Sequence, residues 1–188
     1  MKKPGMKKLG WIVLALLFLL VNSVVSARVA IHDLSKDREW ELELISGREG
    51  VLDGVTVQLV TTKAVTTAIK ADRALVHVRL SLQGPKSALS AWINCRLVLR
   101  DSQNRVWAPM ENKNTDGAVK ILASDRHNNG RCNPTPYDQP ADDRAAFSDQ
   151  VFLVPVETLQ DLVLHVSGYG TRPRALAFAV RPALTTLK

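Results

Sequence analysis

Apolar and polar residues alternate along most of the chain after residue 40, with a period of two. In the segment 76–82, apolar residues alternate with His77, Arg79 and Ser81, and the segment 93–99 repeats the pattern. This alternation is typical of strands that turn one face to a core and the other to solvent. Strands are predicted at 40–44, 55–60, 76–82, 93–99, 105–109, 150–154, 162–167 and 176–181.

Turn-forming residues separate these segments. Gln83–Lys86 contains a Gly-Pro pair, and Asp101–Asn104 is a run of polar turn residues. The segment Thr61–Asp72 fits a strand or a helical turn, and Glu157–Asp161 fits one helical turn. Short strands without a convincing amphipathic helix predict an all-β protein, an antiparallel immunoglobulin-like β-sandwich.

One long segment, residues 110–146, breaks the pattern. It is rich in Asn, Asp, Pro, Gly and Arg, and its one apolar island is Val119–Ala123. Loops of this length are uncommon inside a compact domain. We therefore expect a long polar loop, in which the island forms a short edge strand.

The N-terminus has the pattern of an export signal. Lys2, Lys3, Lys7 and Lys8 precede the apolar run Leu9–Val21, and small residues follow up to Ala27. Together these form a basic region, an apolar region and a site for a signal peptidase. The prediction is cleavage after Ala27, which leaves a single domain at residues 28–188.

The alternative is an uncleaved membrane anchor. A spanning helix needs about 20 predominantly apolar residues, and the strictly apolar run of 13 residues is short for that purpose. Extended to Ala30 it reaches 22 residues, which is long enough to span. The predicted location is periplasmic or secreted. With an uncleaved helix, the chain is instead a single-pass protein that faces the periplasm and meets the membrane only through this segment.

The charge of the exported part is modest. The whole chain has 25 basic and 18 acidic residues, a net charge of +7, but four of the lysines and no acidic residue lie in residues 1–27. The remainder therefore carries a net charge of only +3. Without a basic block or an RNA-binding aromatic motif, this charge argues against a nucleic-acid partner.

Three segments in order resemble a family of exported bacterial immunoglobulin-like domains of unknown function. They are Val76–Leu82, Leu97–Pro109, and Phe152–Pro155 followed by Leu162–Val166, within residues 50–182. The resemblance implies a sandwich fold and an exported location. It implies no catalytic residue, and Asn104 stands where a glycine is more usual in the turn.

The two cysteines, Cys95 and Cys132, are predicted to form one disulfide, because an even count in an oxidising compartment favours pairing. The bond would tether the polar loop to a strand. A metal site at His127 and Cys132 is the alternative, but two ligands fall short of the three or four that a metal needs.

The sequence contains no catalytic or cofactor motif of the kinds that mark hydrolases and metalloproteases. No cofactor and no metal are predicted. The long loop contains several residues with oxygen ligands for calcium, Asp125, Asn128, Asn129, Asp138, Asp142 and Asp143, but they lack the spacing of a calcium loop. An envelope hydrolase that uses His127 or His165 with loop carboxylates is the enzymatic alternative.

A polar and basic face is the candidate binding surface. If the strands around Arg79 and Arg96 pair as a hairpin, their outward side chains share one face. The members of the predicted surface are His77, Arg79, Trp92, Asn94, Arg96 and Arg100. Arginine offers a planar pair of donors to carboxylate or phosphate, and an exposed tryptophan stacks on sugars.

The predicted function is an exported, non-enzymatic binding or structural module of the cell envelope. Its partner is an anionic envelope component or a protein. A membrane-anchored accessory subunit of a larger envelope complex is the alternative, besides the hydrolase. The opposing interpretation of the basic face is that its arginines only solvate the outer surface of a sheet.

Overall fold

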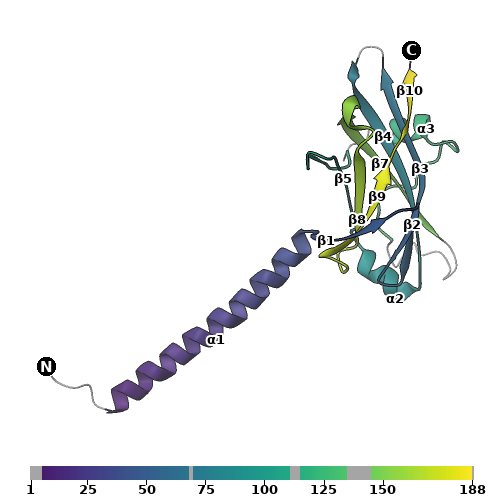
Figure 1. Cartoon of the computed structure of the whole chain (residues 1–188). Coiled ribbons are helices and arrows are strands. Elements are labelled where there is room, and N and C mark those ends of the chain that lie inside the picture. Colours follow the sequence, from purple (N-terminus) through teal and green to yellow (C-terminus); the bar gives the residue numbers. More distant parts are fainter. Residues whose placement is uncertain (1–5, 68–69, 111–114, 135–144, 188) are drawn as a thin grey trace. The chain divides into compact units, whose positions relative to one another are not determined.

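A computed structural model describes residues 6–67, 70–110, 115–134 and 145–187. The chain forms two compact units, residues 1–38 and 39–188. Among the described residues, the first unit contains one helix and the second contains all the strands (Figure 1).

Helix α1, Met6–Asp37, is the N-terminal unit. Within it, Gly10–Ile31 is a stretch of 22 residues with a mean hydropathy of 2.3, long and apolar enough to cross a membrane. The helix is continuous through Ala27, where cleavage was predicted. A helix of this length and composition, near the N-terminus, is typical of a signal sequence or a membrane anchor.

The second unit consists mostly of strands. The strands are β1 (Glu41–Ile45), β2 (Glu49–Leu52), β3 (Val55–Thr67), β4 (Lys70–Gln83), β5 (Arg96–Arg100), β6 (Val106–Trp107), β7 (Ala146–Pro155), β8 (Leu162–Ser167), β9 (Arg174–Val180) and β10 (Ala183–Leu187). The short helical elements are α2 (Lys86–Leu89), η1 (Ser90–Trp92), α3 (Thr115–Leu122) and η2 (Val156–Thr158).

The strands form two sheets. Sheet A has the order β1-β9-β8-β5-β6, and sheet B has the order β10-β3-β4-β7, with β2 paired to β3. Two edge pairs, β1 with β9 and β10 with β3, are parallel, and the other pairs are antiparallel. The expectation of a purely antiparallel arrangement is therefore wrong at two edges.

Apolar side chains from both sheets form one core, the arrangement of a β-sandwich. The inward residues of β4 and β8, such as Val78 and Leu164, have no exposed surface, and Trp92 and Phe178 lie in the same cluster. The period-two pattern thus identified the core faces of β4 and β8 correctly. It was wrong for the predicted strand 40–44, where Leu42 and Leu44 are 41% and 81% exposed. The immunoglobulin-like type of sandwich is not confirmed.

Three local predictions change. Thr61–Asp72 belongs to the strands β3 and β4 wherever it is described. The predicted strand 93–99 begins only at Arg96, because Asn94 has a positive φ of 52° in a turn. Strands β2 and β10, which are absent from the prediction, lie at sheet edges, where alternation is weak.

Helix α3 covers the outer face of sheet B. The island Val119–Ala123, predicted as an edge strand, is helical as far as Leu122 instead. Val119 and Ala123 pack against Val151 of β7. Asp116 and Lys120, one turn apart on the exposed side, form an ion pair of 2.6 Å. Sheet B is consequently covered on both faces over part of its area.

Candidate functional site

The predicted binding surface is not one surface, because its members lie in two different sheets. His77 and Arg79 belong to β4 in sheet B, whereas Arg96 and Arg100 belong to β5 in sheet A. The chain crosses between the sheets through α2 and η1, so β4 and β5 do not form a hairpin. Trp92, expected at the edge of the surface, is 0% exposed in the core. The prediction of a shared basic face is wrong.

His77 and Arg79 do point away from the core between the sheets, but the chain covers them. Asp149 of β7 accepts a hydrogen bond from His77 Nε2 at 2.6 Å, and both side chains are fully buried. Arg79 Nε donates to the same carboxylate oxygen at 2.8 Å. We call His77, Arg79, Asp125, Asn129 and Asp149 the Asp149 cluster.

The Asp149 cluster fastens the segment after α3 onto sheet B. Arg79 donates to Asp125 Oδ2 at 2.7 Å and to the carbonyl oxygen of His127 at 2.7 Å. Asn129 donates to Asp149 Oδ2 through its backbone N–H at 2.8 Å and through its side chain at 2.7 Å. Two residues of the predicted binding surface therefore hold the fold together.

Electrostatics favours the charged form of this carboxylate. Burial works to raise the pKa of Asp149, but hydrogen bonds from His77, Arg79 and Asn129 outweigh it and hold that pKa well below its ordinary value. Hydrogen bonds to Asp149 and Asp125 raise the pKa of Arg79 further above its ordinary value. The ion pair is thus fully charged across the physiological pH range.

The two cysteines lie together at disulfide distance, with 5.5 Å between their Cα atoms. The bond joins the midpoints of two mirrored tripeptides, Asn94-Cys95-Arg96 and Arg131-Cys132-Asn133. The backbone N–H of Asn94 also donates to Asn133 Oδ1 at 3.1 Å. Each tripeptide therefore brings one arginine and one asparagine to the same place.

Both tripeptides line an open groove of about 680 Å³ beside β5. Arg172, from the turn between β8 and β9, lines it as well, so three arginines from distant parts of the chain meet there. The described lining residues include no aspartate and no glutamate. We call this feature the arginine groove.

Much of the remaining lining of the groove is apolar. It includes Val106, Ala108, Pro109 and Met110, and the amide side chain of Gln150 adds a polar group. Strand β6 pairs only with the last two residues of β5, so the groove runs beside the part of β5 that β6 does not reach. The arrangement suits a ligand that is both anionic and partly apolar.

Hydrogen bonds within the chain fix the guanidinium of Arg172. Its Nε donates to the Ser167 hydroxyl oxygen at 3.2 Å, and its Nη2 donates to the carbonyl oxygen of Asn94 at 3.1 Å. The Ser167 hydroxyl in turn donates to the carboxylate of Glu39, whose side chain is 2% exposed. A guanidinium held in this way loses little further freedom when it binds a ligand.

His165 lies beside this chain of contacts on the outer face of sheet A. Its Nδ1 atom is 4.0 Å from Glu39 Oε2, and the histidine is 5% exposed. Burial lowers the pKa of His165, Arg100 lowers it further, and Glu39 partly opposes them. The result is a neutral imidazole under physiological conditions.

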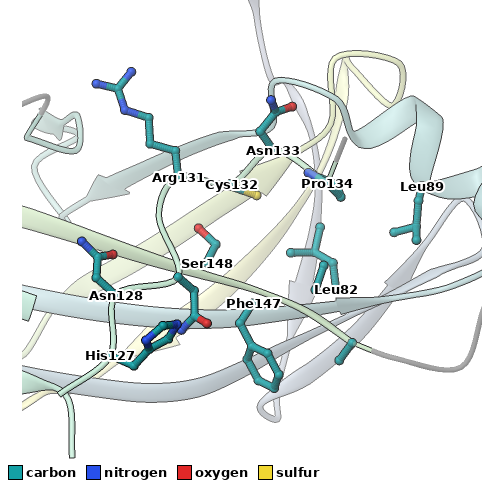
Figure 2. A pocket seen from close by; sticks show the side chains of 13 residues that line it. Leu82, Leu89, His127, Asn128, Arg131, Cys132, Asn133, Pro134, Phe147 and Ser148 are labelled. Carbon is teal, nitrogen blue, oxygen red and sulfur yellow. The ribbon is translucent and has the colours of Figure 1, made fainter. Parts of the chain in front are cut away.

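A second cavity, of about 470 Å³, is lined by residues of the segment 127–134 (Figure 2). Ser148 and Phe147 also line it, and Figure 2 shows Arg131 extending away from Phe147. Arg131, Cys132 and Asn133 line both this cavity and the arginine groove.

The structure does not bring the predicted hydrolase residues together. His127 is exposed on the segment over sheet B, whereas His165 lies on sheet A beside Glu39. Among the described residues, no group of three His, Cys, Asp or Glu side chains is placed to hold a metal ion. Asp125 and Asn129, which were considered as calcium ligands, belong to the Asp149 cluster. Three further candidates, Asp138, Asp142 and Asp143, lie outside the described residues.

Sequence reasoning identified Asn94, Arg96 and the cysteines but missed Arg131 and Arg172. The predicted disulfide contained a signal for Arg131, because pairing the cysteines places their sequence neighbours side by side. For Arg172 there was no such signal, since the turn between β8 and β9 shows no pattern that points to a site.

Comparisons with known proteins assign no family to this chain. No family model matches it, and no curated protein matches it. A "putative lipoprotein" from Staphylococcus aureus is similar in structure, with 12% identity and a TM-score of 0.44, over 77% of this chain and 97% of that one. A "putative lipoprotein" from Bacillus subtilis has 10% identity and a TM-score of 0.44, over 73% of this chain and 39% of that one. The resemblance to exported immunoglobulin-like domains is not confirmed.

Proposed function

We propose that this protein is an exported, envelope-associated binding module that holds an anionic group of its partner in the arginine groove. The observation that carries the proposal is the convergence of Arg96, Arg131 and Arg172 on one groove without a carboxylate among its described lining residues. Guanidinium groups bind carboxylate and phosphate oxygens through paired, charge-assisted hydrogen bonds.

The groove is partly organised before a ligand arrives. All three arginines have contacts within the chain, so a ligand adds to an existing set of contacts. Those of Arg172 with Ser167 and Asn94 fix its orientation. Fixing the donors in advance reduces the entropy lost on binding.

A binding role is favoured over catalysis by where the histidines lie. His77 is buried in the Asp149 cluster, and His165 is covered on sheet A and does not line the arginine groove. Neither is placed to transfer a proton to a ligand in the groove, which needs hydrogen-bond reach.

The test uses the full chain in a zwitterionic detergent and a fluorescein-labelled tetraglutamate peptide as the probe. We expect saturable binding by fluorescence anisotropy that weakens as salt screens the charges. Arg131→Ser removes a charged hydrogen-bond donor and should weaken binding about tenfold or more. Arg181→Ser is the matched control, because it removes the same charge from an exposed position outside the groove.

A further arm defines the chemistry of the ligand. Competition by inorganic pyrophosphate shows whether phosphate oxygens replace carboxylates in the groove. Equal affinity of Arg131→Ser and Arg181→Ser would contradict the proposed site, since the binding would then reflect only the overall charge.

Helix α1 supports the alternative of a membrane-anchored accessory subunit. Its stretch Gly10–Ile31 is long enough to span a bilayer without cleavage. Fractionation of cells that express the full chain, followed by intact-mass analysis, distinguishes the two forms. A soluble product that begins at Arg28 supports a free exported module, and a membrane-bound product that retains Lys2–Ala27 supports the anchored form.

A further inference from the structure

We propose that the Cys95–Cys132 disulfide assembles the arginine groove, so that anion binding and the redox state of the chain are coupled. This inference rests on the proposed function of the groove and adds the regulation of that site. It makes binding stronger in the oxidised chain, and therefore in an oxidising compartment.

The disulfide lies in the lining of the groove. Each cysteine is the central residue of a tripeptide whose three members all line the groove. The tripeptide 94–96 leads into β5 of sheet A, whereas the tripeptide 131–133 follows the segment fastened to sheet B. The disulfide thus ties the two sides of the groove together.

The two tripeptides are attached to different sheets. The backbone N–H of Asp149 donates to the carbonyl oxygen of Gly130 at 2.9 Å, which holds the residue before Arg131 to β7. Arg96 pairs instead with Ser167 of β8 in sheet A. With the bond broken, each tripeptide remains on its own sheet, and the distance between their arginines is no longer covalently fixed.

The two arginines beside the cysteines carry like charges. The bond brings the backbones of Arg96 and Arg131 close to each other, and like charges repel more strongly as they approach. In the reduced chain this repulsion favours separation of the two tripeptides. An anion bound between the arginines opposes it, so the ligand favours the assembled and oxidised groove.

Coupling of this kind is reciprocal. If oxidation strengthens anion binding by some factor, the bound anion makes the disulfide harder to reduce by the same factor. In the reduction itself the S–S bond breaks, and two electrons and two protons come from a dithiol, which is oxidised to its own disulfide. A tenfold coupling corresponds to a shift of about 30 mV in this two-electron couple.

The experiment measures binding of the labelled tetraglutamate peptide to the full chain in detergent, before and after reduction by dithiothreitol. We expect affinity to fall at least tenfold on reduction. The reduction midpoint in dithiol–disulfide buffers should move to more negative potential by about 30 mV for each tenfold when the peptide is saturating. In Arg131→Ser, which keeps both cysteines, reduction should change the remaining affinity little.

Hydrogen exchange at low temperature provides a readout that needs no ligand. On reduction, exchange should rise at residues 94–98 and 130–133 while the amides of β4 and β8 stay protected. Equal affinity in both redox states with unchanged exchange would overturn the inference. So would a general rise in exchange, since the bond would then hold the whole fold and not the groove in particular. An oxidised chain that fails to bind the peptide contradicts the proposed function, and the exchange pattern still decides whether the bond assembles the groove.

Discussion

Removing the Asp149 carboxylate should cost more stability than removing any other single charge in the described part of this protein. The side chain is 0% exposed and accepts hydrogen bonds from His77, Arg79 and Asn129. In Asp149→Ala, the partly buried guanidinium of Arg79, whose side chain is 11% exposed, loses its main partner. Breaking a buried ion pair from one side costs about 3–5 kcal/mol.

That loss translates into a measurable change in melting temperature. For a domain of this size, 1 kcal/mol shifts Tm by about 2–4 °C, so the expected decrease is roughly 6–20 °C. The assay is thermal unfolding of the full chain followed by near-UV circular dichroism. Unfolding should also begin with the segment after α3, which hydrogen exchange detects as early loss of protection around Asn129.

Asp125→Asn is the matched control. Asp125 also pairs with Arg79, at 2.7 Å, but its side chain is 52% exposed, so solvent replaces much of the lost interaction. Its effect on Tm should be small. If Asp149→Ala changes Tm no more than Asp125→Asn does, the reasoning from burial is refuted.

Three other predictions concern the same domain. Burial and, to a lesser extent, the nearby Arg100 lower the pKa of His165 below 6.5. Unfolding at a pH below 6.5 therefore takes up a proton, and the free energy of unfolding should decrease as the pH falls below that value. Urea titrations at about pH 7.5 and about pH 5.5 measure the decrease, and His165→Gln should flatten it; an unchanged dependence in that variant contradicts the assignment. A Cβ atom at Gly168 would lie 2.4 Å from a backbone oxygen, whereas one at Gly117 in α3 meets nothing within 4 Å. Gly168→Ala should therefore lower stability by about 1–3 kcal/mol in denaturant titrations, and Gly117→Ala should raise it by up to about 1 kcal/mol; equal effects would show that the close approach is relieved at no cost. Trp92→Ala should cost about 3–5 kcal/mol, measured as a lower Tm, since its side chain fills the core; a loss below about 1 kcal/mol would mean that the core collapses around the gap.

The sequence pattern predicted which faces of the strands point inward, because burial depends on alternation that a single segment contains. Val78 and Leu164 were assigned to the core in this way, and both are 0% exposed. It did not predict what covers an outward face. His77 alternates like a solvent-facing residue, yet it is buried because α3 and the segment after it lie over sheet B.

The helix α3 shows why short elements are hard to assign. Val119, Leu122 and, directly after the helix, Ala123 have the i, i+3, i+4 spacing of one helical face. An apolar island of five residues also fits a strand. Tertiary packing against Val151 selects the helix.

Only part of the candidate site could be predicted from the sequence, for a different reason. Arg96 and Asn94 lie in an alternating segment, but the groove depends on Arg131 and Arg172, which come from a polar loop and a turn. Such residues meet through long-range topology, and no local pattern encodes their meeting. The disulfide is the one feature of the sequence that linked two of the three elements in advance.

The edge strand β1 has a consequence for solubility. Among the described strands it pairs only with β9, and Leu42 and Leu44 are 41% and 81% exposed, so its other edge is a template for pairing with another strand. Glu41 and Glu43 alternate with these leucines on the same strand. Two copies that paired through β1 would bring four carboxylates together, and we expect their repulsion to disfavour this pairing at neutral pH.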